Sequence, residues 1–222
     1  MAQLSSLRLA IIAIVLAASG GEAVASADDD LSPQERTISI LGVTLSYGRL
    51  IGTVTNLEVT FQERRDASGL MLVFLRGPGK LSPKAQTSIQ QAIYRAAQAA
   101  NLSTDSWTVT ISVPNAVTIH GDSLSAMVGL TVVALAKRDP LRGDVVITGG
   151  VAPDGHISKA GGLSLKLAAA SDAHIRHVIV PDEYDPDEPE WETPFLMRVS
   201  PVDSLQQAYH TFTGIPIAGP RP

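Results

Sequence analysis

The first half of the chain alternates apolar and polar residues in the manner of β-strands. β-Branched and apolar side chains recur at every second position in residues 37–43, 52–62 and 70–75. This period is typical of strands that bury one face. The charged segment 63–69 joins the last two runs, and a further alternating run, residues 107–113, stops at Pro114. The pattern therefore predicts four strands in this part of the chain.

Helical patterns occur in four places. Ser82 and Pro83 supply an N-cap and a first-turn proline ahead of the helix-forming stretch 84–100. A second helix, from about Ser123 or Leu124 to Lys137, is too apolar for an exposed position. The two remaining helices are expected at residues 163–173, after a Gly-Gly turn, and from a cap at Asp203 to about residue 213.

The second half of the chain mixes strands with these helices. Residues 144–151 read as a buried strand, and a Pro-Asp-Gly turn leads to a short returning strand at 156–159. Residues 177–181 and 196–199 are also extended, with an acidic, proline-rich loop at 182–192 between them. Strands and helices interleave without an internal repeat, so we expect an α+β domain in which mixed sheets pack against helices.

The N-terminal residues have the order of a secretory signal peptide. Arg8 precedes the apolar run 9–18, and small residues follow at 25–27. We expect a signal peptide over 1–27 with cleavage after Ala27, a flexible tether over 28–36, the folded domain over 37–214 and a C-terminal tail over 215–222. The mature protein would then be exported, either periplasmic or secreted. The alternative is a retained anchor that gives weak membrane association, although the apolar run is about half of the ~20 residues that span a bilayer.

Composition narrows the function classes. The chain has 17 basic and 22 acidic residues, a formal net charge of −5, which does not favour nucleic-acid binding. Cysteine is absent, so neither disulfides nor thiol catalysis is available. The five histidines form no HExxH motif, and no GxxxxGK[ST] phosphate loop is present. We expect no metal, no cofactor and no use of ATP by this chain.

Ser123 is the first candidate for chemistry. The expected loop 115–120 delivers Gly121, Asp122 and Ser123 to the start of a helix. Backbone amides and the positive end of the helix dipole would there face a developing negative charge, as in an oxyanion hole. A serine at such a position is, by itself, more often only an N-cap.

Lys166 is the candidate base for that serine. It is one polar residue in a small and apolar segment, 161–170. Desolvation of a lysine disfavours its charged form, which lowers its pKa and allows the neutral amine to accept a hydroxyl proton. Thr148, at the end of the buried strand, is placed to set a hydroxyl beside this amine. On residue chemistry alone, a lysine whose ammonium reaches water and a structural threonine remain the alternatives.

Several motifs in order resemble the proteolytic domain of Lon. The stretch 144–167 reads DVVITGGVAPDGHISKAGGLSLKL. It resembles the Lon strand ending in Thr-Gly, the hairpin that follows, the Gly-Gly-Leu turn and the catalytic lysine. Ser123 stands 43 positions before Lys166, which is the spacing of the Lon family. The segments GTVTNLEVT, GPGKLS and SVPNA also resemble Lon, so the similarity covers about residues 37–213. It implies the Lon proteolytic-domain fold, which is ribosomal protein S5 domain 2-like.

The resemblance also implies roles for individual residues. Ser123 would be the nucleophile, Lys166 its general base and Thr148 a partner of the lysine amine, with Gly121 and Asp122 supporting the serine turn. Ser125 has the wrong spacing to Lys166 and is expected to be structural. The expected activity is a serine endopeptidase of the Ser-Lys dyad type that acts without ATP on accessible or unfolded peptides. A homo-oligomer and a monomer both remain open.

Two departures from the family keep other functions open. Gly150 stands where many Lon relatives carry Glu, and His120 stands where an acidic residue often precedes the serine motif. A Lon-like domain that binds peptides without cleaving them is therefore the main alternative. The string Gly-Asp-Ser-Leu at 121–124 also resembles GDSL esterases, but that family places this motif near the start of its domain and ends with an Asp-x-x-His pair.

Overall fold

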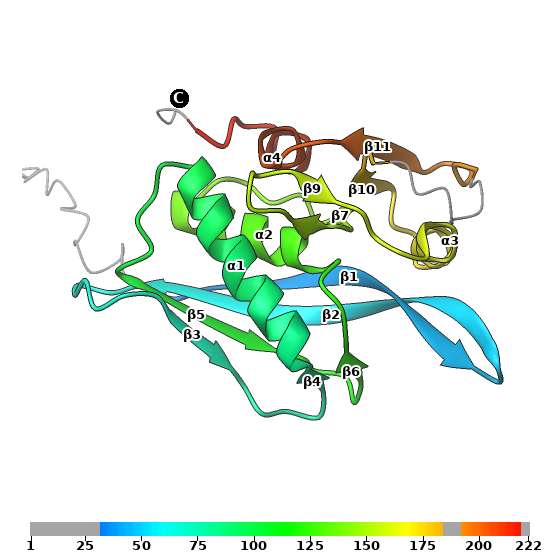
Figure 1. Ribbon diagram of the computed structural model, residues 1–222, viewed down its shortest axis with the longest axis horizontal. Coiled ribbons are helices and arrows are strands. Elements are labelled where there is room, and N and C mark those ends of the chain that lie inside the picture. Colours follow the sequence, from blue (N-terminus) through cyan, green and yellow to red (C-terminus); the bar gives the residue numbers. More distant parts are fainter. Residues whose placement is uncertain (1–31, 184–191, 219–222) are drawn as a thin grey trace, which may run out of the picture. The chain divides into compact units, whose positions relative to one another are not determined.

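The computed structural model describes residues 32–183 and 192–218, and they form a mixed α+β arrangement of strands and four helices, as the sequence predicts (Figure 1). The strands are β1 (Gln34–Ser46), β2 (Arg49–Glu63), β3 (Met71–Phe74), β4 (Lys80–Leu81), β5 (Trp107–Ser112), β6 (Thr118–Ile119), β7 (Val145–Ile147), β8 (Gly150–Val151), β9 (Ile157–Ser158), β10 (His177–Pro181) and β11 (Arg198–Val202). The helices are α1 (Pro83–Ala99), α2 (Ser125–Lys137), α3 (Leu163–Asp172) and α4 (Leu205–Thr213).

The largest sheet has the strand order β1-β2-β5-β3. β1 and β2 form a long antiparallel hairpin that closes through Tyr47 and Gly48, both of which have positive φ. Positive φ at both central residues is the backbone of a type I′ turn, which matches the twist of a two-stranded ribbon. The expected strand from Thr37 begins three residues earlier, at Gln34, which pairs with Phe61 of β2. Part of the segment expected to be a tether is therefore strand.

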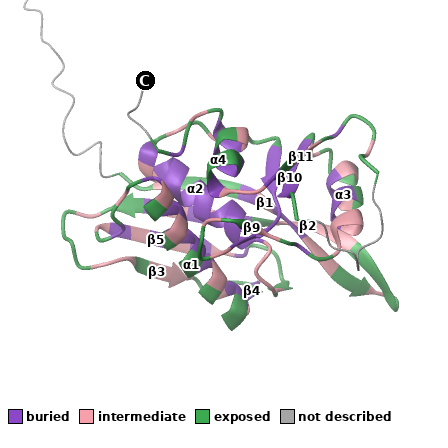
Figure 2. Ribbon diagram, turned by 45° about the horizontal axis from the view of Figure 1, so that its top comes forward, coloured by how far each residue is buried: buried purple, intermediate pink, exposed green. Residues whose placement is uncertain are grey.

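Helices α1 and α2 pack against one another and cover one face of this sheet (Figure 1). All residues of α2 except Ala136 are buried, in agreement with its almost uniformly apolar sequence (Figure 2). Gly129 of α2 lets the two helices approach closely, because a Cβ at this position would lie 2.8 Å from the carbonyl oxygen of Ala92 in α1. Ser82 caps α1 as predicted, accepting a hydrogen bond from the Ala85 amide.

A second sheet is parallel and has the order β11-β10-β7. Helix α3 lies between this sheet and the β1–β2 hairpin, where a small apolar cluster includes Leu41, Leu167 and Val178. Two expected boundaries were wrong here. The last strand begins at Arg198 instead of residue 196, and Ser204, not Asp203, caps α4 by accepting from the Gln207 amide.

The strand expected over residues 144–151 is broken in two. β7 ends at Ile147 and belongs to the parallel sheet, whereas β8 begins at Gly150 and pairs antiparallel with β9. The break occurs because the backbone of Gly149 pairs with the serine turn: its amide donates to Ser123 O, and its carbonyl accepts from Ala126 N. The interruption therefore ties the end of β7 to the residues before α2.

The chain after α4 is held by a buried cation. Lys137 at the end of α2 lies 2.9 Å from the Asp139 carboxylate, and its Nζ donates to the carbonyl oxygens of Pro216 and Ile217 at 3.0 Å each. The first residues of the expected C-terminal tail thus pack against the domain. The expected signal peptide, the first four residues of the expected tether (28–31) and most of the loop at 182–192 lie outside the described residues. In the part of the chain that the structure describes, none of the helices is long and apolar enough to cross a membrane.

Candidate active site

Three of the residues singled out in the sequence meet at one point. The Nζ atom of Lys166 lies 3.0 Å from Ser123 Oγ and 3.2 Å from Thr148 Oγ1, so the amine bridges the two hydroxyl groups. Lys166 is 3% exposed and Thr148 is 1% exposed. The serine hydroxyl, the lysine amine and the threonine hydroxyl therefore form a short polar chain, in which the lysine and the threonine are buried and the serine is partly exposed.

The position of Lys166 follows from the way α3 begins. Gly162 is the N-cap with φ 70°, a left-handed conformation that glycine adopts without strain, and its carbonyl accepts from the Lys166 amide. The next turn of α3 lies directly against β2, because a Cβ added to Gly52 would be only 1.9 Å from the carbonyl oxygen of Leu165. Two glycines thus set the depth at which the lysine side chain enters the site.

The serine turn differs in one respect from the sequence-based expectation. Helix α2 begins at Ser125, so Ser123 precedes the N-cap Leu124 and does not lie in the first helical turn. The Ser125 amide donates to Asp122 O and the Ala126 amide to Gly149 O, so these two amides are already used. Within the described residues, the amides of Ser123 and Leu124 have no backbone acceptor.

Ser123 and Lys166 open into a cavity of about 480 Å³. One wall is β1, an edge strand of its sheet, and the opposite wall is the segment around β6. Seven of the cavity's sixteen lining residues are aliphatic, among them Val43, Leu45 and Ile119, and four are threonines. An extended chain with apolar side chains fits such a lining. His120 is an exposed part of the same wall.

The supporting residues predicted from the serine motif have other contacts. The Asp122 carboxylate forms an exposed ion pair with Lys84 of α1 at 3.2 Å, and its carbonyl oxygen closes the turn to Ser125. Gly121 precedes it with φ 88°. Ser125 is buried and lines a separate groove instead of the cavity that contains Ser123. The structure therefore does not bring Ser125 to the lysine.

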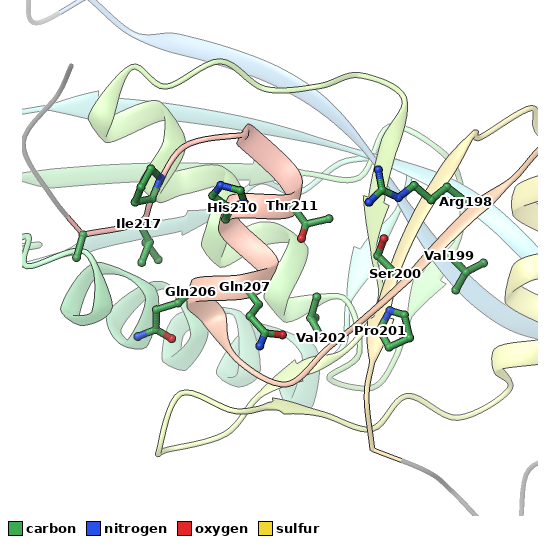
Figure 3. A pocket seen from close by; sticks show the side chains of 12 residues that line it. Arg198, Val199, Ser200, Pro201, Val202, Gln206, Gln207, His210, Thr211 and Ile217 are labelled. Carbon is green, nitrogen blue, oxygen red and sulfur yellow. The ribbon is translucent and has the colours of Figure 1, made fainter.

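A larger cleft, of about 720 Å³, lies between β11 and α4 and contains none of the predicted site residues. Figure 3 shows that its side chains come from β11, from α4 and from the segment after α4 that includes Ile217, with Arg198 and His210 well separated from each other. Its polar groups do not converge on one point, which a catalytic site requires. We therefore assign the candidate chemistry to the smaller cavity. No group of three or more His, Cys, Asp or Glu residues in the described ranges is placed to hold a metal ion.

Sequence reasoning missed the polar groove that Ser125 lines. Lys84 and Arg95 border it, and both belong to α1, about 30 residues away from the serine motif in the chain. Their helical spacing was visible in the sequence, but nothing there indicated that this face of α1 would lie beside the serine turn.

Comparison with known proteins is consistent with this geometry. A family model described as the Lon protease (S16) C-terminal proteolytic domain matches residues 34–207. An archaeal Lon protease from Thermococcus kodakarensis is 33% identical over 95 residues, which are 40% of this chain and 14% of that protein. One from Pyrococcus abyssi is 35% identical over 69 residues, 31% of this chain and 7% of that protein. The chain thus spans only a small part of the length of these relatives.

Proposed function

Because the chain belongs to the family of Lon protease (S16) C-terminal proteolytic domains, we propose that it is a serine endopeptidase with a Ser-Lys dyad. The observation that carries the proposal is the 3.0 Å separation of Lys166 Nζ and Ser123 Oγ at the inner end of an open cavity. This distance is within the range over which a general base takes a proton from a hydroxyl group.

The proposed reaction begins with a neutral Lys166 amine. Burial penalises the charged ammonium, so we expect a pKa below the ordinary lysine value of about 10.4. The amine removes the proton of Ser123, and the serine oxygen forms a bond to the scissile carbonyl carbon. As the tetrahedral intermediate collapses, the C–N bond breaks and Lys166 returns the proton to the leaving amine. Water then hydrolyses the acyl ester with Lys166 again as base.

Thr148 has a positioning role in this proposal. Its Oγ1 lies 3.2 Å from Lys166 Nζ, so it holds the amine in line with the serine hydroxyl. The amides of Ser123 and Leu124 are the proposed donors to the oxyanion, because the next two amides along the chain already have carbonyl acceptors.

The substrate class and the cellular setting belong to the same proposal. The enzyme acts on accessible or unfolded peptides in this proposal, and the absence of a GxxxxGK[ST] motif from the printed sequence supports catalysis without ATP. The apolar N-terminal segment supports export to the periplasm or the medium. N-terminal sequencing of protein from an exporting host tests this part, and a mature chain that still begins at Met1 contradicts it. The proposed fold group, ribosomal protein S5 domain 2-like, is supported by the family and by the mixed α+β arrangement.

Covalent labelling tests the central assignment. A fluorophosphonate probe should label the wild-type chain and fail to label Ser123→Ala, and casein should be cleaved only by the wild type. Ser125→Ala is the matched control, because this serine is two residues away and does not line the cavity that contains Lys166. A wild-type chain that binds unfolded casein but is neither labelled nor active would instead be a non-catalytic peptide-binding domain. Fast turnover of simple acyl esters without casein cleavage would favour an esterase.

A further inference from the structure

A second groove lies on the other side of the serine turn. It encloses about 520 Å³ between α1 and the β8–β9 hairpin, and it is lined by Asp122 and Ser125. These two residues flank Ser123 and Leu124, which line the apolar cavity. The short segment 122–125 therefore separates the cavity that contains Lys166 from the groove that contains Lys84 and Arg95, with the proposed nucleophile at the boundary.

One face of α1 forms the long wall of this groove. Lys84, Ser88, Gln91 and Arg95 all line it, and they recur at the three- to four-residue spacing that places side chains on one helix face. Lys84 and Arg95 are separated by about 16 Å along the helix axis at 1.5 Å per residue. An extended peptide rises about 3.3 Å per residue, so this wall has the length of about five peptide residues.

The groove is cationic although the protein is acidic. Its described lining contains two cationic residues, Lys84 and Arg95, and one acidic residue, Asp122. The groove therefore has an excess of one positive charge, whereas the whole chain has a formal net charge of −5. Asp122 neutralises Lys84 in part through an ion pair of 3.2 Å, in which the Lys84 side chain stays 70% exposed. Arg95 donates to the carbonyl oxygen of Val151 and lies 3.4 Å from Gln91 Oε1.

A glycine lies at a close contact within the groove lining. A Cβ at Gly150 would meet Ser158 Oγ at 2.5 Å, and both residues line the groove. The same Cβ would lie 3.9 Å from Asp122 O, so Gly150 leaves space between the β8–β9 hairpin and the serine turn.

We propose that this groove binds the part of an extended substrate that leaves Ser123 on the side away from the apolar cavity, and that Lys84 and Arg95 select acidic side chains there. The inference rests on the proposed peptidase function. It predicts cleavage sites with apolar residues on one side of the scissile bond and Asp or Glu within about five residues on the other side. Exposed ion pairs are weak, so the selection should be about 3- to 10-fold and should decrease in high salt.

Two pairs of internally quenched peptides test the proposal. The two peptides of a pair have the same sequence except that one has Glu and the other Gln at positions two to five from the cleaved bond. In the first pair these positions lie on the N-terminal side of the cleaved bond, and in the second pair they lie on the C-terminal side. The wild type should show a kcat/KM about 3- to 10-fold higher for the Glu peptide in one pair only. Lys84→Gln should remove most of this preference. Fluorescence anisotropy with Ser123→Ala should give the same preference in Kd.

Two neighbouring glutamines supply matched variants. Gln91→Glu adds a negative charge inside the groove beside Arg95, whereas Gln90→Glu adds the same charge on the same helix at an exposed position that does not line the groove. Gln91→Glu should abolish the preference and Gln90→Glu should keep it. Equal kcat/KM and equal Kd for Glu and Gln peptides in both pairs, or equal losses in the two variants, would overturn the proposal. Preferential binding of a Glu peptide without any cleavage would support the groove as a binding site for acidic side chains but contradict the peptidase function.

Discussion

At the scale of single residues, the Thr148 hydroxyl is the contact that links Lys166 to the parallel sheet. Its Oγ1 lies 3.2 Å from the amine, and its backbone amide donates to Ile179 O of β10. Thr148→Val keeps the shape of the side chain but removes this hydrogen bond. We expect the acylation rate to fall about 10-fold, since one hydrogen bond to such a group contributes about 1.5 kcal/mol. Thr148→Ser should retain most of the rate in a stopped-flow acylation assay.

Thr131 provides the control for this prediction. It is fully buried in α2, and in the described part of the chain its hydroxyl has no hydrogen-bond partner. Thr131→Val should leave acylation unchanged and raise the free energy of unfolding by about 1 kcal/mol, because an unpaired buried hydroxyl is removed. If both valine variants lost activity equally, Thr148 would have only a packing role.

His177 makes stability depend on pH. Burial lowers its pKa below 6.5; the Arg198 and Arg142 guanidinium groups add to this effect, and Asp144 opposes it. The folded state therefore binds this proton less readily than the unfolded state. We expect the free energy of unfolding to decrease as the pH falls from about 6.5 through the lower folded-state pKa. In urea unfolding, His177→Gln should flatten this decrease, whereas the exposed His174→Gln should not. An unchanged slope in His177→Gln would contradict the assignment.

Sequence reasoning identified the candidate pair but not its surroundings. The resemblance to Lon, with its 43-residue spacing, implied the pairing of Lys166 with Ser123, whereas residue chemistry alone left a lysine that reaches water as an alternative; the structure brings the two side chains together. Which backbone amides near Ser123 remain without a carbonyl acceptor could not be predicted. The Ala126 amide, for example, donates a hydrogen bond to the carbonyl oxygen of Gly149, which is distant in the chain. Local sequence carries no information on such a contact.

At the scale of elements, the packing of β2 against α3 sets the depth of the site. A Cβ at Gly52 would lie 1.9 Å from Leu165 O, so Gly52→Ala must displace either the strand or the helix that carries Lys166. Overpacking of this kind costs about 1–3 kcal/mol, and we expect acylation to fall even where the variant is folded. Gly143→Ala, where a new Cβ meets nothing within 4 Å, should change neither thermal unfolding nor acylation. Full activity in Gly52→Ala would show that this contact does not position the lysine.

Long, strongly patterned elements were the predictable ones. The alternation in β1, β2 and β5 and the cap of α1 are local signals, and the structure confirms them. The two-residue strands β4 and β6 were missed because they exist only through pairing with each other across the chain. Asp and Ser both serve as N-caps, so the sequence could not decide between Asp203 and Ser204. The hydrogen bond that Ser204 accepts from the Gln207 amide identifies Ser204 as the cap.

At the scale of the whole molecule, the printed sequence contains no phosphate-loop motif, and we propose catalysis without ATP. Its rate should therefore depend on how much of a substrate is already unfolded. Reduced, alkylated substrate protein should be cleaved equally with and without ATP and magnesium, and the same protein in its tightly folded form should be resistant. A gel-based time course measures both. A large nucleotide dependence in the purified chain would contradict ATP-independent catalysis.

The central claim is that Lys166 acts as the base for Ser123, and the pH profile of acylation by a fluorophosphonate tests it most directly. Wild-type acylation should rise with pH along a limb whose midpoint lies below about 10.4, because only the neutral amine accepts the proton. His120→Ala, which alters the cavity wall but not the dyad, should keep this profile. Lys166→Arg should fail at every pH, because a guanidinium does not release its proton in this range. Acylation of Lys166→Arg at a near wild-type rate would contradict the account.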